Sequence, residues 1–94
     1  MIRSYRDKHT QRFATGERVR QFEPLRRQAE KRLRLLEAAE SLEDLRRLPG
    51  NRLEALRGSR HGQYSIRIND RWRICFEWPA DTDGPENVEI VDYH

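Results

Sequence analysis

Two short stretches in which apolar and polar residues alternate, one on each side of a turn-forming segment, most constrain how this chain can fold. Residues 64–68 read YSIRI and residues 72–76 read WRICF, so every second side chain in each stretch is apolar. This period of two, interrupted at Asn69, Asp70 and Arg71, predicts a β-hairpin with one buried face. We therefore expect a sheet that packs on the rest of the chain through one side.

The length of the hairpin loop determines which side chains share a face, because a shift of one residue moves every side chain to the other side. A two-residue loop would pair Ile66 with Arg73 and bury an arginine. A three-residue loop, residues 69–71, instead pairs Ile66 with Ile74. It also pairs Arg67 with Arg73 and keeps the apolar side chains together. We predict this loop, although its third position usually favours a left-handed glycine and here holds an arginine.

The predicted register places Arg67 directly opposite Arg73 on the polar side of the sheet, where like charges destabilise a strand pair. Three ways of compensating this repulsion remain open. A carboxylate of the protein could neutralise the pair, solvent could separate the two side chains, or a phosphate could bind both guanidinium groups. Only the third would make the pair a functional site.

The first half of the chain has the features of two main helices preceded by a short strand at Met1–Tyr5. Asp7 is a suitable cap for a helix over residues 8–15, and Pro24 suits the first position of a longer one. Ser41 begins a further short helical turn that ends before Pro49-Gly50. The longer helix carries one apolar stripe, consisting of Leu25, Ala29, Leu33, Leu36 and Ala39.

The second half of the chain contains the remaining strands. We expect a strand within Asn51–Gly58, then the hairpin, and a final strand at Asn87–His94 after the Pro-, Asp- and Gly-rich loop 79–86. Val88, Ile90 and Val91 make the final strand apolar on both faces, as in the interior of a sheet. The order β-α-α-β-β-β predicts an α+β fold, a small antiparallel β-sheet packed on two N-terminal helices.

Composition limits the possible functions only loosely. The 94 residues suffice for one small domain, residues 1–94, and the net charge of +3 fits an anionic partner without requiring one. The single cysteine, Cys75, excludes an intramolecular disulfide. No apolar run approaches transmembrane length and no signal peptide opens the chain, so we expect a cytoplasmic protein with no membrane partner.

No motif for a phosphate-binding loop, a metal site or a serine nucleophile is present, and we predict no cofactor and no metal. The strongest chemical candidate is His94, which ends a strand expected to lie near Arg67 and Arg73. A terminal histidine is usually frayed. Yet a histidine transfers protons near neutral pH, and cleavage of RNA through its 2′-hydroxyl needs proton transfer and a positive group to neutralise the phosphorane.

Several short motifs, in the same order along nearly the whole chain, resemble the HigB branch of the RelE-like bacterial toxins. They are IRSYR, ATG, LPGNRL, LRG, SIRIN, WRICF and the terminal VDYH. The resemblance implies a RelE-like fold and a toxin that cleaves messenger RNA in the ribosomal A site. It also implies a HigA-like DNA-binding antitoxin as partner, with operator DNA bound only through that antitoxin.

The resemblance also implies roles for individual residues. Arg67 and Arg73 would hold the scissile phosphate, and His94 would be the general acid or base. Asp92 and Tyr93 would complete the terminal triplet, with Tyr93 stacking on a base.

The chain departs from the family pattern at two places. Arg57 stands where such toxins often carry lysine, which keeps an anion contact but argues against proton transfer, because arginine stays charged. Glu54-Ala55 replaces a common His-Pro pair, which puts a further catalytic histidine in doubt.

Two other readings remain open. The chain could be a non-catalytic toxin, like those of the ParE branch, which act on a protein target such as gyrase. It could also be a ribosome- or RNA-binding module whose arginines only bind phosphates. The presence of Arg67, Arg73 and His94 favours the nuclease over the first of these alternatives.

Overall fold

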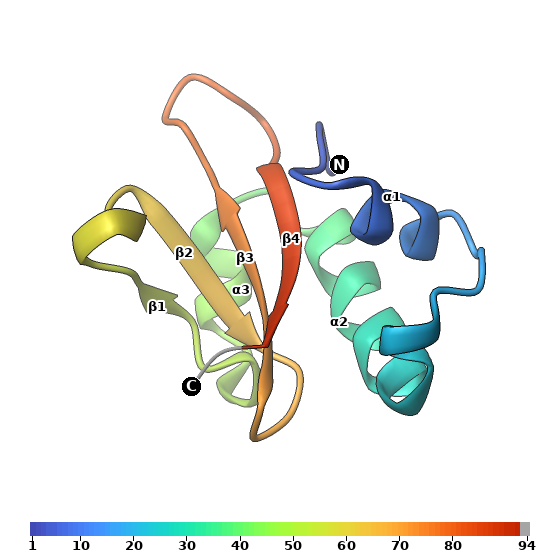
Figure 1. The fold of residues 1–94 in the computed structure, drawn as a ribbon. Helices are drawn as coiled ribbons and strands as arrows, with labels where there is room; N and C mark the ends of the chain where they lie inside the picture. Colours follow the sequence, from blue (N-terminus) through green and yellow to red (C-terminus); the bar gives the residue numbers. More distant parts are fainter. Residues whose placement is uncertain (93–94) are drawn as a thin grey trace.

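The computed structural model describes residues 1–92. The α-helices precede the strands in the chain and pack on one face of an antiparallel sheet (Figure 1). The helical elements are α1 (Lys8–Ala14), the 3-10 turn η1 (Arg20–Leu25), α2 (Arg26–Ala38), α3 (Leu42–Arg46), and the 3-10 turns η2 (Pro49–Asn51) and η3 (Gly58–Arg60). The strands are β1 (Glu54–Ala55), β2 (Gln63–Arg67), β3 (Trp72–Glu77) and β4 (Glu86–Asp92), in the spatial order β1-β2-β3-β4. The predicted α+β class is confirmed.

Side-chain caps begin two of the helices where the sequence predicts them. The Asp7 carboxylate accepts from the Thr10 backbone N–H at 3.4 Å, and Gly16 follows α1 with a φ of 96°. The Ser41 hydroxyl accepts from the Asp44 N–H at 3.3 Å, which starts α3. Polar groups at these helix ends are satisfied by residues adjacent in sequence, so their positions could be predicted.

The long helix begins later than predicted. Pro24 lies inside η1, and α2 starts at Arg26. A 3-10 turn places residues three apart on the same side, and Phe22 and Leu25 are both buried in the core. The 3-10 turn takes the place of the predicted first helical turn and buries both side chains.

The core lies between the apolar stripe of α2 and one face of the sheet. Ala29, Leu33 and Leu36 from the helix are buried in the same cluster as the sheet residues. The sheet contributes Ile66, Ile68, Ile74, Phe76, Val88 and Ile90. The predicted helix stripe and hairpin face therefore form one continuous core.

The hairpin has the predicted register, in which Ile66 is opposite Ile74 and Arg67 is opposite Arg73. Its loop closes without a left-handed residue at the third position. Instead, the Asn69 side-chain oxygen accepts from the backbone N–H groups that follow, of residue 71 at 2.9 Å and residue 72 at 2.8 Å. This side-chain turn replaces the glycine that such loops usually need.

The predicted first strand, Met1–Tyr5, is not a regular strand. The segment forms one parallel bridge between Tyr5 and Val88, with flanking bonds from the Arg3 N–H to the Pro85 carbonyl and from the Val88 N–H to the Ser4 carbonyl. At this point β4 carries Asn87 with a φ of 51° and shifts its register against β3. A bulge disrupts the local ladder, so the N-terminal segment covers the outer edge of β4 without extending the sheet.

The strand expected within Asn51–Gly58 is reduced to the two residues of β1. Left-handed backbone at Arg52, with a φ of 45°, and at Gly58, with a φ of 64°, breaks the extended conformation on both sides. The last strand spans Glu86–Asp92, and the prediction that it lies in the interior of the sheet is wrong, because β4 is the end strand of the sheet order. The N-terminal segment covers part of its free edge through backbone hydrogen bonds. Tyr93 and His94 lie outside the described residues.

Candidate functional site

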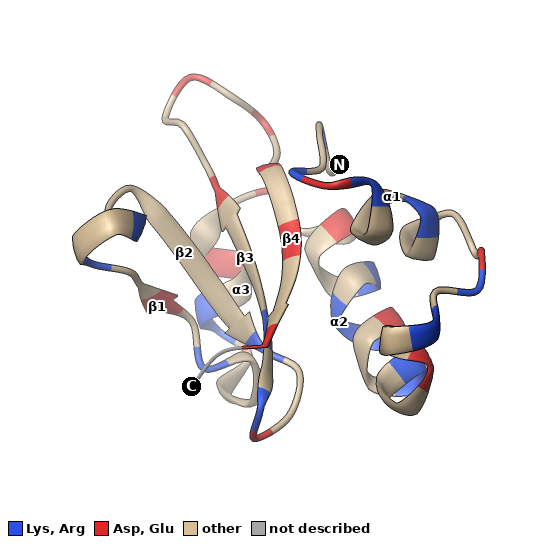
Figure 2. Cartoon of the chain, in the orientation of Figure 1, with Lys and Arg blue, Asp and Glu red and all other residues tan. Residues whose placement is uncertain are grey.

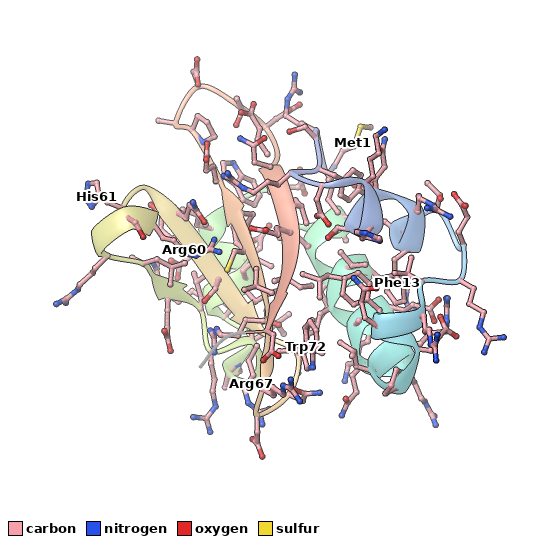
Figure 3. All side chains as sticks on the ribbon, viewed as in Figure 1. Met1, Phe13, Arg60, His61, Arg67 and Trp72 are labelled. Atoms are coloured by element: carbon pink, nitrogen blue, oxygen red, sulfur yellow. The ribbon has the colours of Figure 1, made fainter. Side chains whose placement is uncertain are left out.

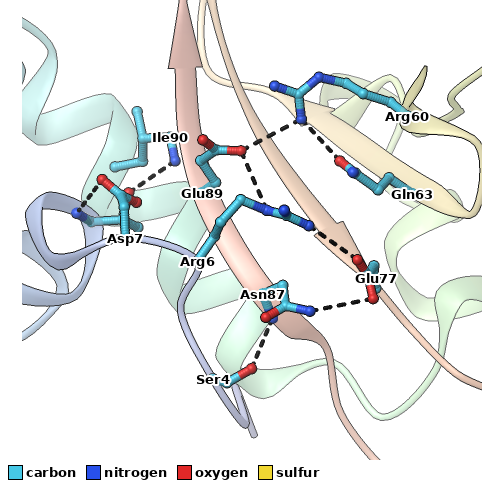
Figure 4. Close-up of polar contacts among 10 residues, drawn as sticks. Ser4, Arg6, Asp7, Arg60, Gln63, Glu77, Asn87, Glu89 and Ile90 are labelled. Carbon is cyan, nitrogen blue, oxygen red and sulfur yellow. Dashed lines mark hydrogen bonds and ion pairs between the residues drawn. The ribbon is translucent and has the colours of Figure 1, made fainter. Parts of the chain in front are cut away.

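The sheet face opposite the helices, here called the outer face, carries the polar side chains of β2 to β4. At its end nearest η3, four charged residues neutralise one another (Figure 4). Arg6 contacts Glu77 at 3.0 Å and Glu89 at 3.6 Å, and Arg60 contacts the same Glu89 at 3.4 Å. This end of the outer face is therefore a closed ion-pair network with little capacity for an external anion.

Cys75 lies buried beneath this network. Burial raises the pKa of its thiol, while the nearby Arg60 opposes the shift. A raised pKa keeps the sulfur protonated near neutral pH, and a thiol is a poor nucleophile. Cys75 therefore has a role in packing and not as a nucleophile.

The hairpin end of the outer face is open, and it holds a pocket of about 250 Å³. We call it the arginine pocket. Its lining consists of Arg52, Glu54, Arg67, Asn69, Asp70 and Arg73. Figure 3 shows Arg67 at this end of the sheet and Arg60 with His61 toward the other. The two predicted phosphate-binding arginines are therefore brought together in one concave site.

Arg73 is held mainly by uncharged acceptors. Its side chain is 11% exposed, its Nε donates to the Ser65 hydroxyl at 2.7 Å, and its Nη2 donates to the Arg52 carbonyl at 2.6 Å. Among residues 1–92, the only carboxylate within ion-pair range of Arg73 is that of Glu54, whose Oε1 lies 3.9 Å from Arg73 Nη2. The Glu54 side chain is 56% exposed. The Arg73 guanidinium is thus fixed in position by neutral acceptors, and no close carboxylate within residues 1–92 neutralises its charge.

The ion-pair partner of Arg67 is a solvent-exposed carboxylate. Arg67 bonds to the Asp70 carboxylate three residues further along the hairpin loop, and that side chain is 99% exposed. Ion pairs with exposed carboxylates contribute little to stability, because solvent screens them. Of the three ways of compensating the facing arginines, the structure thus shows protein carboxylates, both of which are solvent-exposed.

Arg57 is not part of the arginine pocket. The backbone N–H of the preceding Leu56 donates to the carbonyl of Gln63, which begins β2, whereas Arg67 ends that strand. Arg57 is exposed, and its side chain has no hydrogen bond or ion pair with any residue in the described range 1–92. The structure therefore separates this arginine from the pair at the hairpin end.

Asp92 ends β4 opposite Trp72, at the hairpin end of the sheet. Its carboxylate accepts two bonds of 2.9 Å from Arg71 Nε and one of 2.5 Å from Arg71 Nη2. These bonds raise the pKa of Arg71, whose guanidinium also lies 5.8 Å from the Trp72 ring. Asp92 is therefore held in a fixed position, and the predicted Tyr93 and His94 follow it in the sequence, beyond the described residues.

Three contributors to this region were not predicted as functional residues: Arg52, Ser65 and Arg71. Ser65 could have been found, because the predicted register makes it a diagonal neighbour of Arg73. Arg71 was seen only as a loop residue, and its contact with Asp92 depends on how β4 pairs with β3. No sequence pattern places Arg52 at this site, because its left-handed backbone follows from tertiary contacts.

Charge is distributed unevenly along the sheet (Figure 2). Lys and Arg, in blue, gather around the hairpin end, while the loop between β3 and β4 carries acidic residues. Within residues 1–92 no group of three or more His, Cys, Asp or Glu side chains is placed to hold a metal ion. In the same range no helix is both long and apolar enough to cross a membrane.

Comparison with known proteins identifies related sequences and a related fold. A family described as HigB-like toxin, the RelE-like toxin of the type II toxin-antitoxin system HigB, matches residues 3–94. Toxin HigB-1 of Vibrio cholerae serotype O1 is 41% identical over 64 residues, which are 68% of this chain and 64% of that toxin. The aligned segment thus spans slightly less than two thirds of that relative.

A solved structure is similar over the whole chain. The YoeB/ParE toxin from Agrobacterium tumefaciens superposes with a TM-score of 0.50 over 99% of this chain and 97% of that one, at 17% identity. At this level of identity the similarity concerns the fold alone.

Proposed function

Because the chain belongs to the HigB-like family of RelE-like toxins of type II toxin-antitoxin systems, we propose that it is an endoribonuclease that cleaves messenger RNA on the ribosome and so inhibits translation. The observation that carries this proposal is the pair Arg67 and Arg73, opposite each other in an open pocket. Their carboxylate partners are exposed side chains that a phosphate could replace. Guanidinium groups bind phosphate oxygens bidentately and stay charged at every physiological pH.

The reaction that suits this arrangement is cleavage through the ribose 2′-hydroxyl. The 2′-oxygen forms a bond to phosphorus while the bond from phosphorus to the 5′-oxygen breaks, leaving a 2′,3′-cyclic phosphate and a 5′-hydroxyl. The 2′-proton passes to a base, and the 5′-oxygen receives a proton. Arg67 and Arg73 would stabilise the extra negative charge on the phosphorane, and Arg73 is already oriented for this by Ser65.

We assign His94 as the proton-transfer group of this reaction, because histidine exchanges protons near neutral pH. Asp92, held by Arg71, would position the residues that follow it. Tyr93 would stack on a base of the messenger. Arg57 would bind a backbone phosphate outside the arginine pocket, since its guanidinium has no partner within residues 1–92.

The family also supports partners for this chain. We propose a cognate HigA-like DNA-binding antitoxin as its inhibitor, with operator DNA bound only through that antitoxin. The substrate would be messenger RNA in the ribosomal A site. The net charge of +3 is consistent with a partner that is rich in phosphate.

The experiment that tests this function compares a defined messenger RNA free in solution with the same messenger positioned on ribosomes. We expect new 3′ ends carrying a cyclic phosphate only in the ribosome sample, and their loss with His94→Ala. Arg12→Ala serves as control, because it removes an exposed charge on α1, paired with Glu17 and remote from the hairpin.

The opposite result is equally informative. Intact RNA in both samples, from a protein that still arrests growth, would refute the nuclease proposal and favour a protein target. Cleavage that persists in His94→Ala would instead refute the assignment of the proton-transfer group.

A further inference from the structure

We propose that Arg52 supplies a third guanidinium to the arginine pocket, where it binds a backbone phosphate of RNA as the carboxylates of Glu54 and Asp70 are displaced. This inference rests on the proposed function, because it takes RNA as the ligand. Neither the sequence motifs nor the family resemblance assigns Arg52 a role. The inference follows from the backbone conformation of Arg52, its missing partners and the charge of the pocket.

The backbone at Arg52 adopts a conformation that is rare for a residue with a side chain. Its φ of 45° and ψ of 54° are left-handed, and Asn87 is the only other non-glycine residue with positive φ among residues 1–92. Such strain persists where the surrounding structure imposes it, and it concentrates at functional sites. Here it turns the Arg52 carbonyl toward Arg73 Nη2, at 2.6 Å.

The preceding residue fixes this turn from inside the protein. Asn51 is fully buried, its Oδ1 accepts from Arg32 Nη1 at 2.7 Å, and its Nδ2 donates to the Leu45 carbonyl at 3.0 Å. These two bonds anchor η2 to α2 and α3. The position of Arg52 at the pocket is therefore set by a rigid support.

Arg52 is one of the residues that line the pocket, and it is exposed. Its guanidinium makes no hydrogen bond or ion pair with any part of the chain from residue 1 to 92, in contrast to Arg67 and Arg73. A third arginine in the lining of the pocket raises the local positive potential, and an unpaired guanidinium has all its donors available to a ligand.

The charge of the pocket favours an anion such as a phosphodiester. Three arginines and two carboxylates line it, so it carries one net positive charge before a ligand binds and more once the carboxylates are displaced. The volume of about 250 Å³ is roughly eight times the share of one water molecule in the liquid, which leaves space for a phosphate with parts of its sugars. The carboxylates of Glu54 and Asp70 can move away from the arginines at little cost in free energy, because their side chains are 56% and 99% exposed, respectively.

The test measures binding without cleavage, so that it is independent of the nuclease reaction. The probe is a short single-stranded RNA whose 2′-hydroxyls are methylated, titrated into the free protein at several salt concentrations. The key variant is Arg52→Asn, because asparagine tolerates left-handed backbone and the carbonyl that holds Arg73 remains. Arg52→Lys retains the charge, and Arg12→Ala removes an equal charge on α1.

We expect Arg52→Asn to weaken binding about tenfold at low salt, as for the loss of one charged hydrogen bond. The slope of log K against log salt should fall by about 0.7, which corresponds to one phosphate contact on a single strand. Arg52→Lys should recover most of the affinity, and Asp70→Asn should bind more tightly than the wild type. Arg12→Ala should bind like the wild type.

The inference fails if Arg52→Asn binds as tightly as Arg12→Ala, or if Arg52→Lys is no better than Arg52→Asn. It also fails if the wild type does not bind the probe while it still cleaves messenger RNA on ribosomes. Binding that depends on Arg52, in a protein that cleaves no RNA on ribosomes, would support the pocket and refute only the nuclease proposal.

Discussion

Asn51 offers the sharpest test of how the arginine pocket is supported. Replacing it with alanine removes two hydrogen bonds at a fully buried position, one from Arg32 and one to the Leu45 carbonyl. We expect Asn51→Ala to lower stability strongly and to release η2, together with the Arg52 carbonyl that holds Arg73.

The magnitude follows from the two bonds. A hydrogen bond to a charged group contributes about 1.5–3 kcal/mol, and a neutral one about 0.5–1.5 kcal/mol. Their loss predicts a decrease of about 2–4 kcal/mol in the free energy of unfolding. For a domain of this size the melting temperature should fall by roughly 10 °C or more.

Urea denaturation of the purified protein, followed by circular dichroism, measures this change. Gln28→Ala is the matched control, because its amide makes only an exposed contact of 3.4 Å with Asn69 and should cost less than about 0.5 kcal/mol. Adding Arg32→Ala to Asn51→Ala should cost little more than Asn51→Ala alone, because the shared bond is already lost. A loss below about 1 kcal/mol, close to that of the control, would refute the role given to Asn51.

Two further predictions concern the outer face. Ser65→Ala removes the 2.7 Å hydrogen bond from Arg73 Nε to the Ser65 hydroxyl. We expect single-turnover cleavage on ribosomes to slow about tenfold or more, without a change in substrate affinity. An unchanged cleavage rate together with a lower stability would show that Ser65 has only a structural role. Burial raises the pKa of Cys75, so its thiol ionises first in the unfolded chain and alkaline conditions favour unfolding. Between about pH 8 and pH 10, the wild type should therefore lose more stability than Cys75→Ala in denaturant titrations, and equal losses would contradict this explanation.

Much of the fold could be predicted because it depends on interactions between residues close in sequence. The alternation around Asn69 led to the correct register, since only one loop length keeps Ile66 and Ile74 on the apolar face. Asp7 and Ser41 cap their helices through bonds to residues three positions on. Such local interactions are the same in any fold that buries the hairpin face.

The errors in the predicted strands have a common cause. Residues 1–5 and 51–58 were predicted to form strands, but left-handed backbone at Asn87 and Arg52 interrupts regular pairing beside them. Asparagine adopts left-handed backbone more often than most residues, but nothing in the local sequence signals this conformation at Arg52. The left-handed backbone is imposed by contacts with residues distant in the chain, such as the hydrogen bond that the Asn87 backbone N–H donates to the Ser4 hydroxyl at 2.9 Å.

The sequence by itself determined that Arg67 and Arg73 face each other, because alternation and loop length specify which side chains share a row of the sheet. Only the tertiary structure decided what surrounds that pair. The buried Asn51 turns the chain so that Arg52 joins the pocket, whereas Arg57 lies at the other end of β2. Pairing within a hairpin is a local property, while the charge and shape of a pocket depend on loops that meet only after the chain has folded.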